Sequence, residues 1–130
     1  MMNLLIVLAT LGLGLAHDFY ITQPWAETSW KAGDTVTITW KLYQNVGPEA
    51  GGINIDLMDG DDLAANLLLN VAANLHPESV SYDWTIPKSV SSSDKVFIRI
   101  TGMGEVANYR FSHRFTITDG EGPGITHSVA

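Results

Sequence analysis

Alternation of apolar and polar residues dominates this chain, and it is clearest between residues 35 and 42. Every second position there is apolar, and threonines or a lysine fill the positions between. Because successive side chains of a β-strand point to opposite faces, this period of two predicts a strand with one buried face. A Gly-Asp turn precedes it, and we expect the turn and strand to belong to the first strand pair of a sandwich. The predicted inward residues are Val36, Ile38, Trp40 and Leu42.

The same kind of pattern recurs along the chain, bounded each time by Gly, Pro, Asn, Asp or Ser. Seven such segments predict an all-β fold, an antiparallel β-sandwich of the immunoglobulin-like or fibronectin-III-like kind. The predicted strands cover residues 19–23, 35–42, 52–58, 63–69, 80–86, 95–102 and 110–118. The further residues expected between the two sheets are Ile53, Ile55, Leu57, Val80, Tyr82, Trp84, Ile86, Val96, Ile98 and Ile100.

Two segments leave a choice open. Residues 63–75 are rich in alanine and leucine, which favour a helix by propensity, but the sandwich context favours a strand over 63–69 followed by a turn. The last predicted strand is either continuous, with His113 pointing inward beside Phe111 and Phe115, or bent at residues 112–114, with His113 on the surface.

Three regions divide the chain. Residues 1–16 form an apolar stretch ending in small residues, which predicts a secretory signal peptide, since a membrane-spanning helix needs about 20 residues. Residues 17–118 then form one sandwich domain, and residues 119–130 form a flexible, Gly-rich tail. That tail has no apolar segment of the kind a GPI anchor requires, so we expect a secreted, extracellular protein with neither a membrane span nor an anchor.

Charge and composition limit the classes of partner that this protein is expected to bind. Seven Lys and Arg stand against 14 Asp and Glu, which gives a net charge of −7, and no basic run occurs. Binding to nucleic acid or to an anionic membrane depends on clustered positive charge, so both are disfavoured and a neutral or cationic partner is expected. The chain has no cysteine, so its stability must come from the core alone. We expect a monomer.

Aromatic residues offer a carbohydrate-binding surface, because a sugar ring stacks on an exposed aromatic face. Trp40 and Trp84 lie at inward positions and are expected in the core. The predicted carbohydrate-binding residues are Trp25 and Trp30, which flank the first turn, and Tyr43; a second interpretation makes the two tryptophans a hydrophobic staple. Further aromatic residues predicted to be exposed are Phe97 and Tyr109.

Copper binding is the main alternative to the carbohydrate-binding function. Cleavage after residue 16 would leave His17 first, and its amine and imidazole could bind copper together with a second histidine, either His113, His76 or His127. We expect no cofactor in the main interpretation, in which His17 is an ordinary terminal residue. A calcium site at the aspartates of residues 56–62 is disfavoured because the ligand spacing of an EF-hand is absent and Asp59-Gly60 suits a hairpin turn.

No enzymatic activity is expected. The acidic residues fall mostly in predicted turns or at solvent-facing strand positions, where a pair of carboxylates would not flank a cleft as glycoside hydrolysis requires. No nucleophile motif is present in the sequence either.

An ordered set of short segments resembles the N-terminal Ig-like module of the fungal Kre/Knh cell-wall proteins, a Ser/Thr-rich GPI-anchored membrane family. They lie at residues 21–24, 26–40, 55–60, 81–87, 97–102 and 108–118. The resemblance implies a non-enzymatic role in the assembly of wall β-glucan, β-1,6-linked, through contact with cell-wall polysaccharide or a wall protein. The alternatives are the copper protein described above and a secreted adhesin or effector whose sheet edge pairs with a protein partner.

Overall fold

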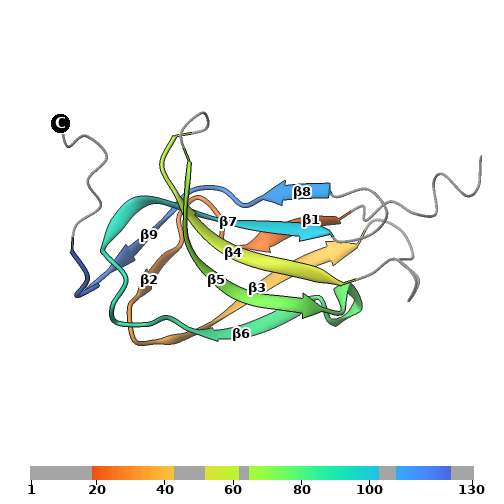
Figure 1. Cartoon of the computed structure of the whole chain (residues 1–130), viewed down its shortest axis with the longest axis horizontal. Coiled ribbons are helices and arrows are strands. Elements are labelled where there is room, and N and C mark those ends of the chain that lie inside the picture. Colours follow the sequence, from red (N-terminus) through yellow and green to blue (C-terminus); the bar gives the residue numbers. More distant parts are fainter. Residues whose placement is uncertain (1–18, 43–51, 62–64, 103–107, 124–130) are drawn as a thin grey trace, which may run out of the picture.

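Two β-sheets pack face to face in the computed structural model, which describes residues 19–42, 52–61, 65–102 and 108–123 (Figure 1). The smaller sheet has the order β1-β3-β6. Its strands are β1 (Phe19–Gln23), β3 (Thr35–Leu42) and β6 (Ser81–Thr85). β3 is antiparallel to both neighbours and pairs with β1, the predicted strand at 19–23. The Gly-Asp turn does not join this pair, because it follows β2 (Ser29–Lys31), which lies in the larger sheet.

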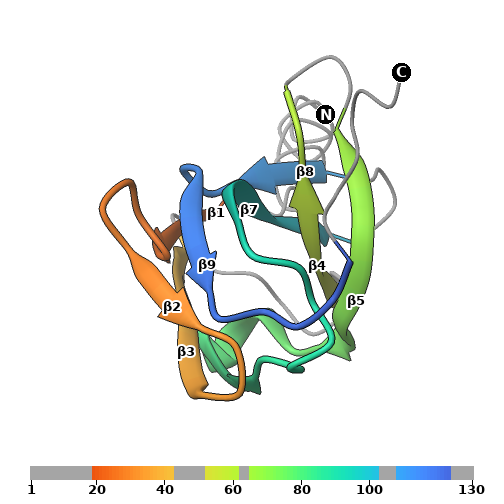
Figure 2. The same ribbon diagram turned by 90° about the vertical axis from the view of Figure 1, so that its left-hand side faces the viewer.

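The larger sheet has the order β2-β9-β7-β4-β5, and β8 pairs with β7 beside β9. All its pairings are antiparallel except that of β2 with β9, which is parallel. Figure 2 shows β4, β5 and β8 on one side of the interior and β3 on the other. The strands are β2 (Ser29–Lys31), β4 (Ile53–Asp59), β5 (Asn66–Leu75), β7 (Ser93–Gly102), β8 (Asn108–Phe111) and β9 (Phe115–Thr118). The predicted sandwich is therefore confirmed, with nine strands among the described residues.

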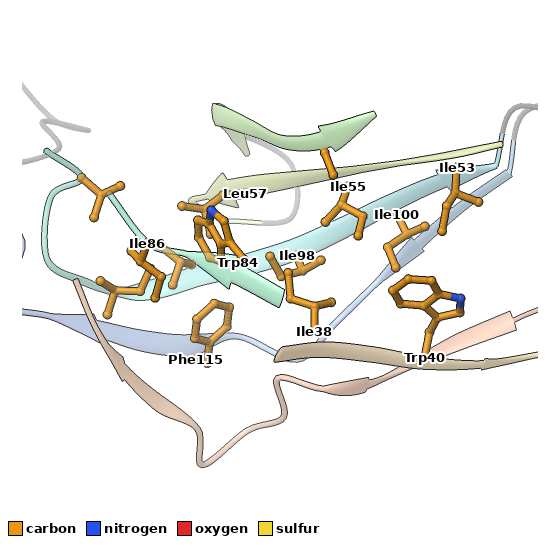
Figure 3. Packing of buried hydrophobic residues seen from close by; sticks show 14 of the residues in the cluster. Ile38, Trp40, Ile53, Ile55, Leu57, Trp84, Ile86, Ile98, Ile100 and Phe115 are labelled. Atoms are coloured by element: carbon orange, nitrogen blue, oxygen red, sulfur yellow. The ribbon is translucent and has the colours of Figure 1, made fainter. Parts of the chain in front are cut away.

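Inward side chains of both sheets fill the space between them (Figure 3). Ile38 and Trp40 of β3 lie opposite the isoleucines of β4 and β7, and all are nearly inaccessible to solvent. Burying one such aliphatic side chain contributes about 1.5–3 kcal/mol. The Trp40 indole N–H donates to the Pro77 carbonyl oxygen at 2.8 Å, so its polar group is satisfied inside the core.

Val80 was expected in the core and is not there. β6 begins at Ser81, and Val80 is 39% exposed at the end of a short 3-10 helix, η2 (Pro77–Ser79). Its φ of 52° lies in the left-handed region, and its N–H donates to the Pro77 carbonyl oxygen at 3.2 Å. This turn breaks the alternation one residue before the strand, which the apolar pattern alone did not reveal.

β5 differs from its predicted bounds. The expected strand at 63–69 followed by a turn is instead a ten-residue strand that continues to Leu75, while residues 62–64 lie outside the described part of the structure. Three register irregularities against the seven residues of β4 accommodate the extra length. Asn70 stabilises one of them, because its side-chain amide donates to the carbonyl oxygens of Ile55 and Ala72 at 3.3 and 3.2 Å.

The last predicted strand is bent. β8 ends at Phe111, β9 begins at Phe115, and His113 lies exposed between them, so the inward alternative for His113 is wrong. Ser112 fixes the break: its hydroxyl oxygen accepts the Ile98 N–H at 2.9 Å and the hydroxyl donates to the His113 carbonyl oxygen at 2.8 Å. Arg110 then ties β8 to the other sheet by donating to the Phe19 carbonyl oxygen at 3.1 Å.

Residues 119–123, at the start of the predicted tail, pack against the loop 88–92. The Glu121 N–H donates to the Lys88 carbonyl oxygen at 2.8 Å, and the Gly122 N–H donates to that of Val90 at 3.0 Å. A Cβ at Gly122 would clash with the backbone of this loop. We call this arrangement the C-terminal clasp.

Candidate functional site

The outer face of the larger sheet carries a row of four side chains, one from each of four adjacent strands. Strand register places Phe111 of β8 opposite Arg99 of β7, Arg99 opposite Asp56 of β4, and Asp56 opposite Asn70 of β5. Because Ile98 and Ile100 on β7 point into the core, Arg99 between them points outward. Four residues that are far apart in the sequence therefore lie next to one another across the sheet.

An ion pair lies at the centre of this row. Arg99 Nη2 is 3.0 Å from Asp56 Oδ2, and the Asn70 amide donates to Asp56 Oδ1 at 2.9 Å, so both carboxylate oxygens are engaged. Asp56 is only 7% exposed. Within the described residues, the Arg99 Nε–H is buried and has no hydrogen-bond partner. An unpaired buried donor costs stability, so this N–H offsets part of the stabilisation that the ion pair provides.

Aromatic rings flank the ion pair. Phe97 and Phe111 meet edge to face, with ring centroids 6.0 Å apart, and the Arg114 guanidinium lies 4.8 Å from the Phe97 ring centroid. Phe111 is 59% exposed, whereas Phe97 is 5% exposed. The expectation that Phe97 is exposed is therefore wrong, because Phe111 and Arg114 cover it. Tyr109 is exposed as predicted, and the Arg99 guanidinium lies 5.6 Å from its ring centroid.

Arg99, Phe97, Phe111 and Arg114 border a hollow of about 530 Å³, which we call the outer-face groove. Its volume falls in the range of small-molecule sites, about 300–1,000 Å³. Arg114 closes one end, since its Nε and Nη2 donate to the Gly60 carbonyl oxygen at 3.0 and 2.7 Å. The groove is lined by Met58, Ala65, Phe97, Arg99, Phe111, Ser112 and Arg114.

The predicted carbohydrate-binding residues lie elsewhere. Trp25 is 48% exposed in the turn between β1 and β2, where its N–H donates to Thr28 Oγ1 at 3.0 Å. Trp30 is half-buried on β2 and makes edge-to-face contacts with Phe115 and Trp84, at centroid distances of 5.0 and 6.4 Å. Tyr43 lies outside the described residues.

The residues considered for metals are dispersed. His17 and His127 lie outside the described residues, and His76 and His113 are exposed. No group of three or more His, Asp or Glu side chains within the described ranges is placed to hold a metal ion. Asp56 and Asp59 were expected in turns or on solvent-facing positions, but both are buried. Each has a partner, since Ser93 Oγ donates to Asp59 Oδ1 at 3.2 Å while Asp56 pairs with Arg99.

The groove was missed from the sequence, although one signal was present. The outward positions of the strand at 95–102 carry Phe97 and Arg99, an aromatic and a charged residue where a solvated strand face usually has small polar ones. Without the strand order, the sequence does not show that Asp56 and Phe111 lie beside Phe97 and Arg99 on the same face of the sheet.

Comparison with known proteins gives a family match. No curated protein matches the chain. In the described part, no helix is long and apolar enough to cross a membrane. The family model of the Kre9/KNH-like N-terminal Ig-like domain matches residues 23–117, from the end of β1 into β9. This range includes every strand that builds the groove and most of the described sandwich, so the chain belongs to the Kre9/KNH family through this Ig-like domain.

Proposed function

We propose that this protein is a secreted, non-enzymatic component of the fungal cell surface that takes part in the assembly of wall β-glucan, β-1,6-linked, by binding wall polysaccharide or a wall protein. Membership of the Kre9/KNH family is the observation that carries this proposal, since the family suggests a role in cell-wall glucan assembly. The match spans nearly the whole sandwich, so the proposal applies to this domain itself.

The surface chemistry supports a neutral polymer as the ligand. A net charge of −7 without a basic run disfavours polyanions, while exposed aromatic rings provide faces on which sugars can stack. The exposed aromatic rings that could stack against a sugar include Trp25, Tyr109 and Phe111. Of the two predicted tryptophans, Trp25 is the more exposed and better suited to act as a platform, because Trp30 is held edge-on by Phe115 and Trp84.

The carboxylates of β4 support a binding role rather than a catalytic one, because their oxygens are already hydrogen-bonded within the protein. Asp56 accepts hydrogen bonds from Arg99 and Asn70, and Asp59 is fully buried beside Ser93. A general acid or base would need to reach a substrate, and neither side chain is free to do so.

Polysaccharide retention tests the proposal. The naturally processed, secreted protein is incubated with insoluble β-1,6-glucan, β-1,3-glucan, chitin and cellulose, and the bound fraction is measured beside a protein of similar charge. We expect retention on β-glucan, strongest on the β-1,6-linked polymer. Absence of retention on all four polymers would contradict polysaccharide binding, and capture of a wall protein in its place would leave only the wall-protein form of the proposal.

A further inference from the structure

We propose that the outer-face groove is the sugar-binding site, in which a ring of a neutral glucan chain stacks on Phe111 while its hydroxyl groups bond to the Arg99 guanidinium. This inference rests on the proposed function and assigns it to a surface that the sequence did not indicate. The groove is the place where an exposed ring and convergent polar groups lie together.

Phe111 has the properties of a stacking platform. More than half of the residue is exposed, yet its ring is held by the edge-to-face contact with buried Phe97. Phe97 is in turn covered by the Arg114 guanidinium. A ring fixed in this way loses little conformational freedom when a ligand binds, which favours affinity.

The polar groups beside Phe111 suit hydroxyl groups, which both donate and accept hydrogen bonds. Arg99 lines the groove and its side chain is partly exposed, so its guanidinium supplies N–H donors to sugar oxygens. Register places Arg99 directly opposite Phe111, so a ring lying on Phe111 has its edge within reach of the guanidinium.

Charge favours a neutral ligand over an ion. Asp56 compensates the charge of Arg99 at 3.0 Å, so the Arg99 guanidinium offers planar hydrogen-bond donors whose charge is already neutralised. A volume of about 530 Å³ falls within the range of small-molecule sites and accommodates a short stretch of sugar chain.

The test monitors the Arg99 side chain by NMR while the sugar is added. The full chain, labelled with ¹⁵N-arginine, is titrated with soluble β-1,6- and β-1,3-linked gluco-oligosaccharides, and the arginine Nε–H resonances are recorded by NMR. We expect the Arg99 resonance to shift with saturation. Phe111→Ala should weaken binding about tenfold, as loss of about 1.4 kcal/mol of aromatic contact implies.

Two further variants isolate the site. Arg99→Lys keeps the positive charge beside Asp56 but lacks the planar fork of donors, so it should fold and still bind more weakly. Tyr20→Ala removes an exposed ring from β1 of the other sheet and should bind like the wild type. The melting temperature of each variant shows whether it is folded.

The outcomes separate this inference from the proposed function. If the wild type binds glucan while Phe111→Ala and Arg99→Lys bind equally well and the Arg99 resonance stays unchanged, the groove is not the site and the proposed function stands. If the wild type binds neither the oligosaccharides nor the insoluble polymers, polysaccharide binding fails and this inference fails with it.

Discussion

Asp56 shows how a charged residue is kept inside this sheet. The carboxylate is nearly buried, yet Arg99 and Asn70 engage both of its oxygens. Buried charges of this kind are tolerated only as complete networks, because removing one member leaves the other uncompensated.

Asp56→Ala is therefore expected to lower the free energy of unfolding by about 2–4 kcal/mol, since Arg99 would keep its charge without a partner. Urea denaturation followed by fluorescence measures this. The matched control is Asp61→Ala, an exposed carboxylate just after β4, which should change stability by less than about 0.5 kcal/mol. Equal stability of the two variants would mean that the ion pair contributes nothing.

Val80 adopts a backbone conformation that is unfavourable for a β-branched residue and that another residue would tolerate better. A β-branched side chain at φ 52° is strained by about 1–2 kcal/mol, whereas asparagine tolerates this region. We expect Val80→Asn to raise the melting temperature by roughly 4–8 °C, the shift that about 1 kcal/mol produces in a domain of this size. Val36→Asn, at a half-buried strand position, should lower it. A lower melting temperature for Val80→Asn would show that its partial packing outweighs the strain.

At the scale of elements, the C-terminal clasp holds the loop 88–92 against residues 119–123 by backbone hydrogen bonds. Gly122→Ala should destabilise the fold by about 1–3 kcal/mol, because the added methyl group would meet the Ser89 carbonyl oxygen. Thermal unfolding checks this. Glu121→Ala, one residue earlier and exposed, should be nearly neutral, since its contact with Lys88 is a weak surface pair at 4.0 Å. A neutral Gly122→Ala would contradict the close packing of the clasp.

Elements with a strict period of two could be predicted from the sequence, and those that depend on distant pairing could not. In β3, β4 and β7 an apolar residue recurs at every second, inward position, so these inward residues were identified. In β5 the bulges shift the alternation, and its consecutive leucines hide the pattern. β2 is three residues long and exists because β9, some 85 positions later, lies parallel to it.

The candidate site could be predicted only in part for the same reason. An exposed Tyr109 and a surface role for aromatic residues follow from local sequence. The row from Phe111 to Asn70 requires the register of three strand pairs, and no local spacing contains it. Burial of Phe97 likewise depends on Arg114, which reaches it from the segment beyond β8.

For the whole molecule, the edge of the larger sheet at β5, which has no further strand beside it among the described residues, bears on self-association. An exposed strand edge can pair with a second copy, but bulges disfavour this by twisting the edge, and β5 has three irregularities. We therefore expect a monomer. Analytical ultracentrifugation should give the monomer mass at micromolar and near-millimolar concentrations alike. A mass that rises toward a dimer over this range would contradict the prediction and favour the adhesin-like alternative.

Retention of the secreted protein on insoluble β-1,6-glucan, measured for the wild type and for Phe111→Ala side by side, tests the central claim most directly. The account predicts that the wild type is retained and that the variant is retained roughly tenfold less well at equal concentration, while remaining folded. A wild type that passes through the glucan unbound would contradict polysaccharide binding by this sandwich.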